Sequence, residues 1–324
     1  MIHALAITGP TASGKTSLSI DVAKALGCEI ICMDSMQIYE RMDIGTAKAT
    51  KEERSAVAHH MLDFLSPKES FSAKAYKDMA MPIAEEIAGR GKIPLFVGGT
   101  GLYLSTLIRR AAPEPPESDP EYRRKTEETL DSEEKRIELW ERLRQIDPES
   151  AAAVHYNNTR RVIRALEIFD ATGQTKSYFD ALTRQKNDQI EITHITLDFH
   201  DRENLYARIN ERVDAMLGDG LYGEVKSLLD EGMLKEHTTA AQAIGYKEMA
   251  EAIRSLITLD EASEKIKQAT RNYAKRQLTW FRNTTDTHTV YTDGEDGVFR
   301  SREEILSECL AIFSDAVKNF ADRY

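Results

Sequence analysis

The sequence has few of the features that mark secreted, membrane-spanning or metal-stabilised proteins. Its 324 residues include three cysteines, Cys28, Cys32 and Cys309, too few for a disulfide framework or a cysteine-based metal site. We expect buried or unreactive thiols and a reducing cytoplasm. No apolar run approaches the ~18 residues of a membrane span. The chain opens without a basic, cleavable leader, so we expect neither a membrane partner nor a signal peptide.

Positive charge is also scarce, because the formal net charge is −11. This argues against a protein that coats nucleic acid, since non-specific binding depends on phosphate neutralisation. Local basic patches remain compatible with that charge. The contents of 41% hydrophobic and 30% charged residues are those of an ordinary globular protein, for which we expect a monomer. The length suffices for one α/β domain with an appended element.

Apolar runs alternate with helical segments over most of the chain. Strands separated by helices indicate βαβ units and a parallel sheet. After Pro113-Glu-Pro-Pro116 the sequence becomes charged and helical. We therefore predict an α/β sheet domain from 1–115 and 181–324, interrupted by a helical insertion at 116–180. The expected strands are 3–8, 29–33, 93–97, 194–198 and 287–291, and the clearest helices are 17–26 and 72–90.

A phosphate-binding motif, G-x-x-x-x-G-K-[ST], separates the first expected strand from the first helix, which is the context it requires. Its glycines let backbone N–H groups surround phosphate oxygens, and the helix N-terminus adds partial positive charge. Lys15 supplies a point charge and Thr16 a hydroxyl ligand for Mg²⁺. The loop consists of Gly9, Pro10, Thr11, Ala12, Ser13, Gly14, Lys15 and Thr16.

Two further loops follow strands at the same expected edge of the sheet. Asp34 comes after the second strand, and Gly98-Gly-Thr100 after the strand at 93–97. Parallel sheets bind ligands beyond the carboxyl ends of their strands, so Asp34 is expected to face the P-loop ligand. Topology alone leaves two roles open for Asp34, a Mg²⁺-holding acid or a general base. Thr100 is either a helix N-cap or also a ligand contact.

The P-loop by itself fits several classes of protein. A small-molecule kinase fits the motif, although such enzymes commonly have shorter chains and an arginine-rich lid. A GTPase is disfavoured because no N-K-x-D motif occurs. A non-catalytic RNA-binding module would not need a phosphate cradle.

Two expected helices carry basic residues on one side. Arg160, Arg161 and Arg164 share a ~100° arc opposite apolar positions. The stretch 265–282 has six basic and no acidic residues, with Ile266, Tyr273 and Trp280 as the expected buried seam. Both surfaces suit phosphate contacts, although a solvated charged face is the ordinary alternative.

The chain resembles the bacterial tRNA dimethylallyltransferases, also called tRNA isopentenyltransferases. Matching segments occur in the family's order over nearly the whole chain, and 117–157 match least well. Ala49 replaces a common proline, and the zinc-finger extension of eukaryotic members is absent. The segments are GPTASGKT at 9–16, DSMQIYERMDIGTAK at 34–48, HHMLD at 59–63, VGGTGLY at 97–103, RRVIRALE at 160–167, INERVDAML at 209–217, QAIGYKE at 242–248 and KRQLTWFR at 275–282.

The resemblance implies transfer of a dimethylallyl group from dimethylallyl diphosphate to N6 of the adenosine 3′-adjacent to the anticodon of tRNA. It implies Asp34 as the general base with Thr100 beside it, and Lys15, Thr16 and Arg212 with Mg²⁺ on the diphosphate. ATP could also occupy the P-loop. The resemblance also implies the fold of a P-loop NTPase-like parallel sheet, with a helical insertion that would hold the anticodon stem-loop. Implied tRNA contacts are Asp34, Ser35, Met36, Gln37, Thr100, Arg123, Arg160, Arg161, Val162, Ile163, Arg164, Gln242, Ala243, Ile244, Gly245, Tyr246 and Lys247.

Overall fold

A computed structural model describes residues 1–109, 115–182, 187–235 and 238–321. The chain forms two compact units, one of Met1–Ile108 with Gln189–Tyr324 and one of Arg109–Asp188. We call them the sheet unit and the helical unit. The helical unit extends further at both ends than the insertion expected at 116–180. Among the described residues, no helix is long and apolar enough to cross a membrane.

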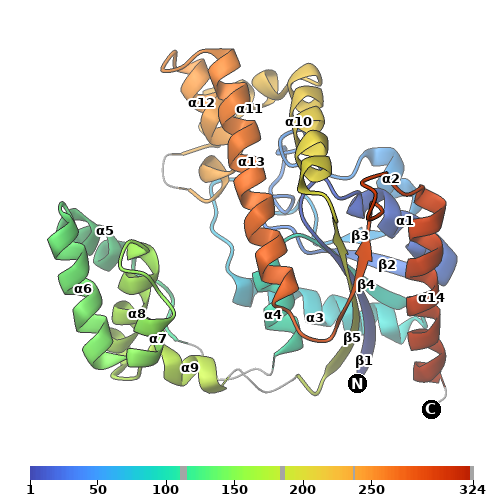
Figure 1. Ribbon diagram of the computed structural model, residues 1–324, viewed down its shortest axis with the longest axis horizontal. Coiled ribbons are helices and arrows are strands. Elements are labelled where there is room, and N and C mark those ends of the chain that lie inside the picture. The colour runs from blue at the N-terminus through green and yellow to red at the C-terminus, as the bar shows by residue number, and fades with distance from the viewer. Residues whose placement is uncertain (110–114, 183–186, 236–237, 322–324) are drawn as a thin grey trace. The chain divides into compact units, whose positions relative to one another are not determined.

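The sheet unit is built on a six-stranded parallel sheet (Figure 1). Its strand order is β3-β2-β4-β1-β5-β6, which confirms the α/β class. Thr8 at the end of β1 pairs with Gly98 on one side and Thr196 on the other, so three strand ends meet at one edge. The strands are β1 (Ile2–Thr8), β2 (Cys28–Cys32), β3 (His59–His60), β4 (Ile93–Gly98), β5 (Ile190–Asp198) and β6 (Thr287–Tyr291).

Alternate residues of β1 enter two different cores. Leu5 and Ile7 pack with α1 (Lys15–Leu26) and α14 (Arg302–Ala321). Ala4 and Ala6 point to the opposite face, where α3 (Ala73–Gly89) and α4 (Gly101–Ile108) lie. This alternation is the period of two expected of a strand whose two faces are both covered.

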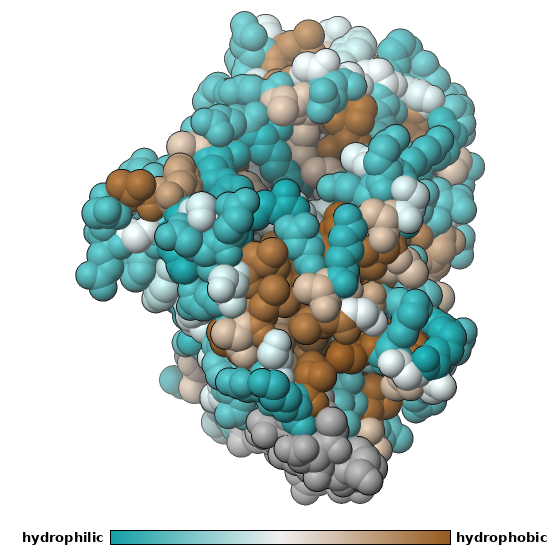
Figure 2. Space-filling view, turned by 90° about the vertical axis from the view of Figure 1, so that its right-hand side faces the viewer, coloured by the Kyte–Doolittle hydropathy of each residue, from teal (hydrophilic) through white to brown (hydrophobic). Residues whose placement is uncertain are grey.

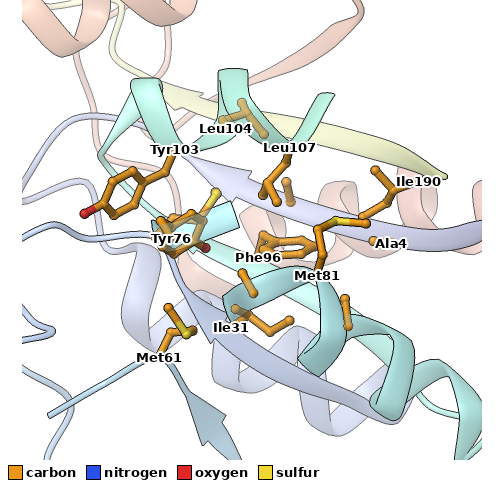
Figure 3. Close-up of a cluster of buried hydrophobic side chains, with 14 of the residues drawn as sticks. Ala4, Ile31, Met61, Tyr76, Met81, Phe96, Tyr103, Leu104, Leu107 and Ile190 are labelled. Carbon is orange, nitrogen blue, oxygen red and sulfur yellow. The ribbon is translucent and has the colours of Figure 1, made fainter. Parts of the chain in front are cut away.

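The core under α3 and α4 reaches the ligand edge of the sheet. Tyr76 and Tyr103 stack with ring centroids 4.0 Å apart. Figure 3 shows the Tyr103 hydroxyl pointing away from Phe96, Met81 and the rest of this cluster. The aromatic pair therefore lies at the boundary between this hydrophobic core and the polar residues at the ligand edge, such as Asp34.

The opposite face of the sheet is covered by α1 and α14. In Figure 2, apolar side chains gather in the lower half of the view, bordered by hydrophilic ones. Helix α14 lies on this side of the sheet unit in Figure 1, and its Ile305, Leu306 and Leu310 are only partly buried where they pack on the core. Part of this apolar layer is therefore in contact with solvent. All three cysteines are buried and unbridged, as expected.

Local sequence signals set the ends of the longest helices. Ser72 caps α3 by accepting a hydrogen bond from the Ala75 N–H. Thr258 and Glu261 form a reciprocal capping box that begins α13 (Leu259–Arg282). The expected helix at 72–90 therefore agrees with α3 and its two caps. The shorter β3 and α2 (Lys51–Ala56) were not predicted, although Thr50 and Glu53 form a capping box at the start of α2.

A third core joins α13 to the loop after β2. Ile38, Val213, Tyr246 and Ile266 are its buried members. The helices around it are α10 (Arg202–Gly218), α11 (Leu221–Asp230), the short 3₁₀ helix η1 (Ala240–Gln242) and α12 (Tyr246–Ile253).

The helical unit has its own small core. Leu143, Val162, Ala165 and Leu166 are buried together. Asp147 and Ser132 each cap a helix with a side-chain hydrogen bond. The helices are α5 (Pro120–Glu128), α6 (Glu133–Ile146), α7 (Pro148–Ala152), α8 (Thr159–Thr172) and α9 (Lys176–Leu182).

Candidate functional site

The P-loop leaves the central strand β1 and enters α1. Gly9 has φ of +142°, and a Cβ there would lie 2.7 Å from the Leu197 carbonyl oxygen, so only glycine fits. Within the loop, Ser13 is 3% exposed, and its hydroxyl has no hydrogen-bond partner among the described residues. A buried orphan hydroxyl is costly, and a phosphate oxygen in the loop would satisfy it.

The Lys15 side chain turns back onto the P-loop. Its Nζ donates to the carbonyls of Gly9 at 3.0 Å and Pro10 at 2.6 Å. Burial and the neighbouring Arg212 guanidinium lower the Lys15 pKa to about 7, against the opposing effect of Asp34. The ammonium therefore sits where a negatively charged ligand would stabilise it.

Asp34 stands directly after β2 and is fixed by its own backbone. Its Oδ1 accepts hydrogen bonds from the N–H groups of Met36 at 2.9 Å and Gln37 at 3.4 Å. The carboxylate interacts electrostatically with Lys15 and Arg212. The sheet thus brings Asp34 to the P-loop, as the topology predicted.

Thr100 connects the turn after β4 to the loop after β2. Its Oγ1 accepts from the Ser35 N–H at 3.1 Å, while its carbonyl accepts from the Tyr103 N–H at the start of α4. The N-cap role is therefore carried by the backbone, and the hydroxyl is used between the two loops. Thr100 lies beside Asp34 through this contact with the adjacent Ser35.

Helix α13 places two polar side chains over these loops. The buried Gln277 accepts from the Thr11 N–H at 2.9 Å and donates to the Gly99 carbonyl at 2.9 Å. A Cβ on Gly99 would lie 2.2 Å from the Gln277 Nε2, so any larger residue there would displace this amide. The Tyr273 hydroxyl hydrogen-bonds with Thr100 and Gln277, and burial with the nearby Asp34 raises its pKa.

Helix α10 supplies two arginines to the same edge, where it follows β5 (Figure 1). Arg212 is half-buried, donates to the Thr46 carbonyl at 3.4 Å and lies near Lys15 and Asp34. Arg208, one turn earlier, has its Nη2 3.4 Å from the position of a Cβ on Gly14. The P-loop is therefore surrounded by cations.

The loop 34–48 is held by ion pairs to a buried lysine and by hydrogen bonds to Glu224. The Lys48 ammonium, 1% exposed, contacts Asp43 and Asp63, each at 2.7 Å. The Glu224 carboxylate accepts from the N–H groups of Asp43, Ile44 and Gly45. Gln37 donates to the carbonyls of Thr46 and Ala47, and Met36 packs on the third core. These contacts fix the loop that carries Asp34.

Part of the segment 242–247 is buried in the third core. Tyr246 is fully buried and donates to Glu224 at 2.5 Å, and Ala243 and Gly245 are also buried. The expected contact of this segment with tRNA stays a prediction. Gln242 and Lys247 are exposed, and Ile244 is half-buried.

Three of the six basic residues in the stretch 265–282 pair with acidic residues of other elements. Arg282 binds Asp198 at 2.7 and 2.9 Å, and Lys267 binds Asp214 at 2.7 Å. Lys265 pairs with Glu251 at 3.0 Å. The expected seam also differs, since Ile266 is buried but Tyr273 and Trp280 are half-buried. The stretch is therefore partly compensated, by acidic partners that are distant in sequence.

The helical unit separates its arginines into two groups. Arg160 and Arg161 are exposed and have no ion pair among the residues described. Arg164 and Arg123 both pair with the buried Glu167, at 2.8 and 3.3 Å. Val162 and Ile163 are each 1% exposed, and Val162 belongs to the core of the unit. Their expected place on the tRNA side stays a prediction.

Three site residues were missed by sequence reasoning. Gln277 and Tyr273 were treated as parts of a motif and of the core, and Arg208 was not singled out. The spacing of Arg208 and Arg212 by four residues on a helix was an available signal. Nothing in the sequence marks Gln277 as the bridge between two loops.

The donor set for a metal is small. Within the described ranges, no group of three His, Cys, Asp or Glu residues could hold a metal ion. Mg²⁺ commonly keeps waters and binds through one or two protein oxygens with substrate phosphates. The Thr16 hydroxyl and the Asp34 carboxylate fit that limited contribution.

Comparisons with known proteins agree with this arrangement. The model of the family described as IPP transferase matches residues 37–284. A tRNA dimethylallyltransferase of Bacillus velezensis is 46% identical over 305 residues, covering 94% of this chain and 95% of that protein. That of Bacillus subtilis is 47% identical over 277 residues, covering 86% and 87%.

Solved structures give the same relationship. The crystal structure of tRNA delta(2)-isopentenylpyrophosphate transferase from Staphylococcus epidermidis has a TM-score of 0.69 and 40% identity, covering 97% of this chain and 99% of that one. A eukaryotic dimethylallyltransferase acting on tRNA has a TM-score of 0.79 and 28% identity, covering 98% and 80%. With its P-loop, Asp34 and Thr100 gathered at one edge of the sheet, this chain belongs to the IPP transferase family.

Proposed function

We propose that this chain transfers a dimethylallyl group from dimethylallyl diphosphate to N6 of the adenosine directly 3′ of the anticodon in tRNA. The observation that carries this proposal is the placement of a carboxylate, Asp34, beside a P-loop in a member of this family. The loop supplies a diphosphate site, and the carboxylate supplies a base next to it.

The donor's diphosphate is assigned to the P-loop. Its backbone N–H groups and the Ser13 hydroxyl surround the phosphoryl oxygens, and Lys15 exchanges the loop carbonyls for the anion. When bound, Mg²⁺ held by the Thr16 hydroxyl and phosphate oxygens would neutralise charge on the diphosphate. Arg212 stabilises the negative charge that develops as the C–O bond breaks.

The acceptor nitrogen is assigned to the Asp34 side. An exocyclic adenine amine is a weak nucleophile because its lone pair is delocalised into the ring. As N6 forms its bond to the allylic carbon and diphosphate leaves, the amine proton passes to the Asp34 carboxylate. Such a base contributes typically ~10²–10⁴-fold. The hydrogen bonds from Met36 and Gln37 to Oδ1 hold the carboxylate in place for this transfer.

The tRNA side is assigned to exposed basic and polar residues. Arg160 and Arg161 of the helical unit would contact backbone phosphates, and Gln242 and Lys247 of the sheet unit are further candidates. The adenine must leave its stack to enter a protein pocket, and a single-stranded loop makes this least costly. Local cations allow RNA binding despite the chain's net charge of −11.

One experiment tests the reaction directly. The chain is incubated with Mg²⁺, total tRNA and dimethylallyl diphosphate labelled in the prenyl group, and the tRNA is digested to nucleosides. Label in an N6-modified adenosine is the expected result. No label in RNA, together with transfer of the γ-phosphoryl group of ATP to a small molecule, would replace this proposal with a kinase.

A further inference from the structure

Arg208 is a half-buried cation whose charge is not matched by an ion pair in the described part of the chain. It makes no hydrogen bond there, although a guanidinium has five N–H donors. Its guanidinium lies over the Phe299 ring, 5.6 Å from the centroid. Burial lowers its pKa, while Glu211 acts in the opposite direction. An arginine stays charged under these conditions, so its donors remain available.

The Arg208 guanidinium lies beside the P-loop. Its Nη2 lies 3.4 Å from where a Cβ on Gly14 would be, so it borders the residue that begins the turn into α1. Arg212 is a second guanidinium nearby, beside Lys15, and the Asp34 carboxylate interacts electrostatically with both. A surplus of partly buried positive charge requires an anion to offset its desolvation.

We propose that Arg208 is a donor-binding residue that grips the terminal phosphoryl group of the diphosphate, remote from the transferred prenyl group. This inference rests on the proposed function. Arg212 faces Lys15 and Asp34 together and therefore marks the reacting end of the donor. Arg208 lies four residues earlier, about 6 Å along α10, beside Gly14. The planar fork of an arginine suits bidentate contact with a phosphoryl group.

The two arginines then differ in their kinetic effects. Arg208 binds a group whose charge changes little during bond cleavage, so it should contribute equally to ground state and transition state. Loss of such uniform binding raises KM for the donor and leaves kcat nearly unchanged. Arg212 acts on the leaving oxygen, so its loss should lower kcat.

The test compares Arg208→Gln, Arg208→Lys and Arg202→Gln in the full chain. Arg202 is an exposed arginine on the same helix and serves as the charge-matched control. Calorimetry measures binding of inorganic pyrophosphate with Mg²⁺, and thermal melts verify that each variant is folded. Arg208→Gln should weaken pyrophosphate binding about 10- to 100-fold, with a smaller loss for Arg208→Lys and none for Arg202→Gln.

The possible results distinguish a failure of the Arg208 assignment from a failure of the proposed reaction. If the wild type binds pyrophosphate and Arg208→Gln binds it equally well, Arg208 has no part in the donor site, and the proposed reaction stands. If the wild type does not bind pyrophosphate, the diphosphate role of the P-loop fails, and both proposals fall. A fall in kcat without a rise in donor KM for Arg208→Lys would also overturn the assignment to the terminal phosphoryl group.

Discussion

The side chain of Gln277 accepts a hydrogen bond from the Thr11 backbone N–H at 2.9 Å. The same amide donates to the Gly99 carbonyl at 2.9 Å, and Gln277 is 6% exposed. One residue of α13 thus ties the P-loop to the turn that carries Thr100. This bridge joins residues that are 266 apart in the sequence. Because of it, α13 contributes to the catalytic edge as well as to the core.

Replacing Gln277 with leucine should impair catalysis more than it impairs folding. The change leaves a buried N–H and a buried carbonyl without a partner, which costs about 1–3 kcal/mol of unfolding free energy. Freed loops would misplace the donor relative to Asp34, and kcat/KM should fall about 10- to 100-fold. Urea unfolding and steady-state kinetics measure the two effects separately.

Two companion variants sharpen this result. Gln268→Leu alters an exposed glutamine on the same helix and should leave turnover unchanged. Gln277→Glu keeps the acceptor for Thr11 but loses the donor for Gly99, so it should recover only part of the activity. Full activity in Gln277→Leu would show that the bridge has no part in positioning.

Asp34→Asn should lower kcat by about 10²-fold or more, because an amide cannot accept the adenine proton. The amide oxygen can still accept from Met36 and Gln37, so the loop should keep its shape. Single-turnover transfer with labelled donor measures the rate, and filter binding measures tRNA affinity, which should change little. An unchanged rate at saturating substrates would mean that Asp34 serves only as a metal-holding or structural acid.

The parallel sheet and its ligand edge were predictable because they follow from local patterns. Local patterns alone predict that Lys15, Asp34 and Thr100 lie at one edge of the sheet. These patterns are the apolar runs, the glycine-rich motif and the order of the strands. The β6 strand lies at its predicted bounds, Thr287–Tyr291. Such features depend on residues near each other in sequence, or on the general rule that parallel strands share an edge.

What could not be predicted depends on pairing between distant segments. The charge on α13 appeared free because its partners, Asp198, Asp214 and Glu251, lie outside the stretch. Likewise, nothing in the sequence indicates that the Tyr246 ring is buried, with its hydroxyl bonded to Glu224, which lies 22 residues earlier. Helical periodicity identifies a face but does not say what covers it.

The affinity for pyrophosphate should depend on pH through Lys15. With a pKa of about 7, this lysine is mostly neutral at pH 8 in the free protein. A bound anion favours the charged form, so binding should take up close to one proton at pH 8. Affinity should therefore rise as pH falls from 9 toward 7, and the Lys15 contribution should level off below 7.

Calorimetry in buffers of different ionisation enthalpy measures this uptake. Lys15→Arg is the matched control, because an arginine is charged throughout this range and has no proton to gain. Subtracting its uptake removes the protons that belong to pyrophosphate itself. Equal uptake by the two proteins would indicate that Lys15 is already charged before the ligand binds.

Arg160 and Arg161 should account for more of the salt dependence of tRNA binding than other cations of the helical unit. Both are exposed and unpaired within the described residues, whereas Arg164 is held by Glu167. Each phosphate contact on a single-stranded target contributes about −0.7 to the slope of log K against log salt, so changing both to glutamine should flatten this slope by about 1.4.

The control changes Arg124 and Lys125 to glutamine, which removes the same charge from two exposed residues already paired with Glu128 and Glu121. Its slope should stay close to that of the wild type, and pyrophosphate affinity should be the same in all three proteins. Equal flattening in both double variants would show that only the net charge of the unit matters, and an unaltered slope in the Arg160 and Arg161 variant would remove these arginines from the RNA surface.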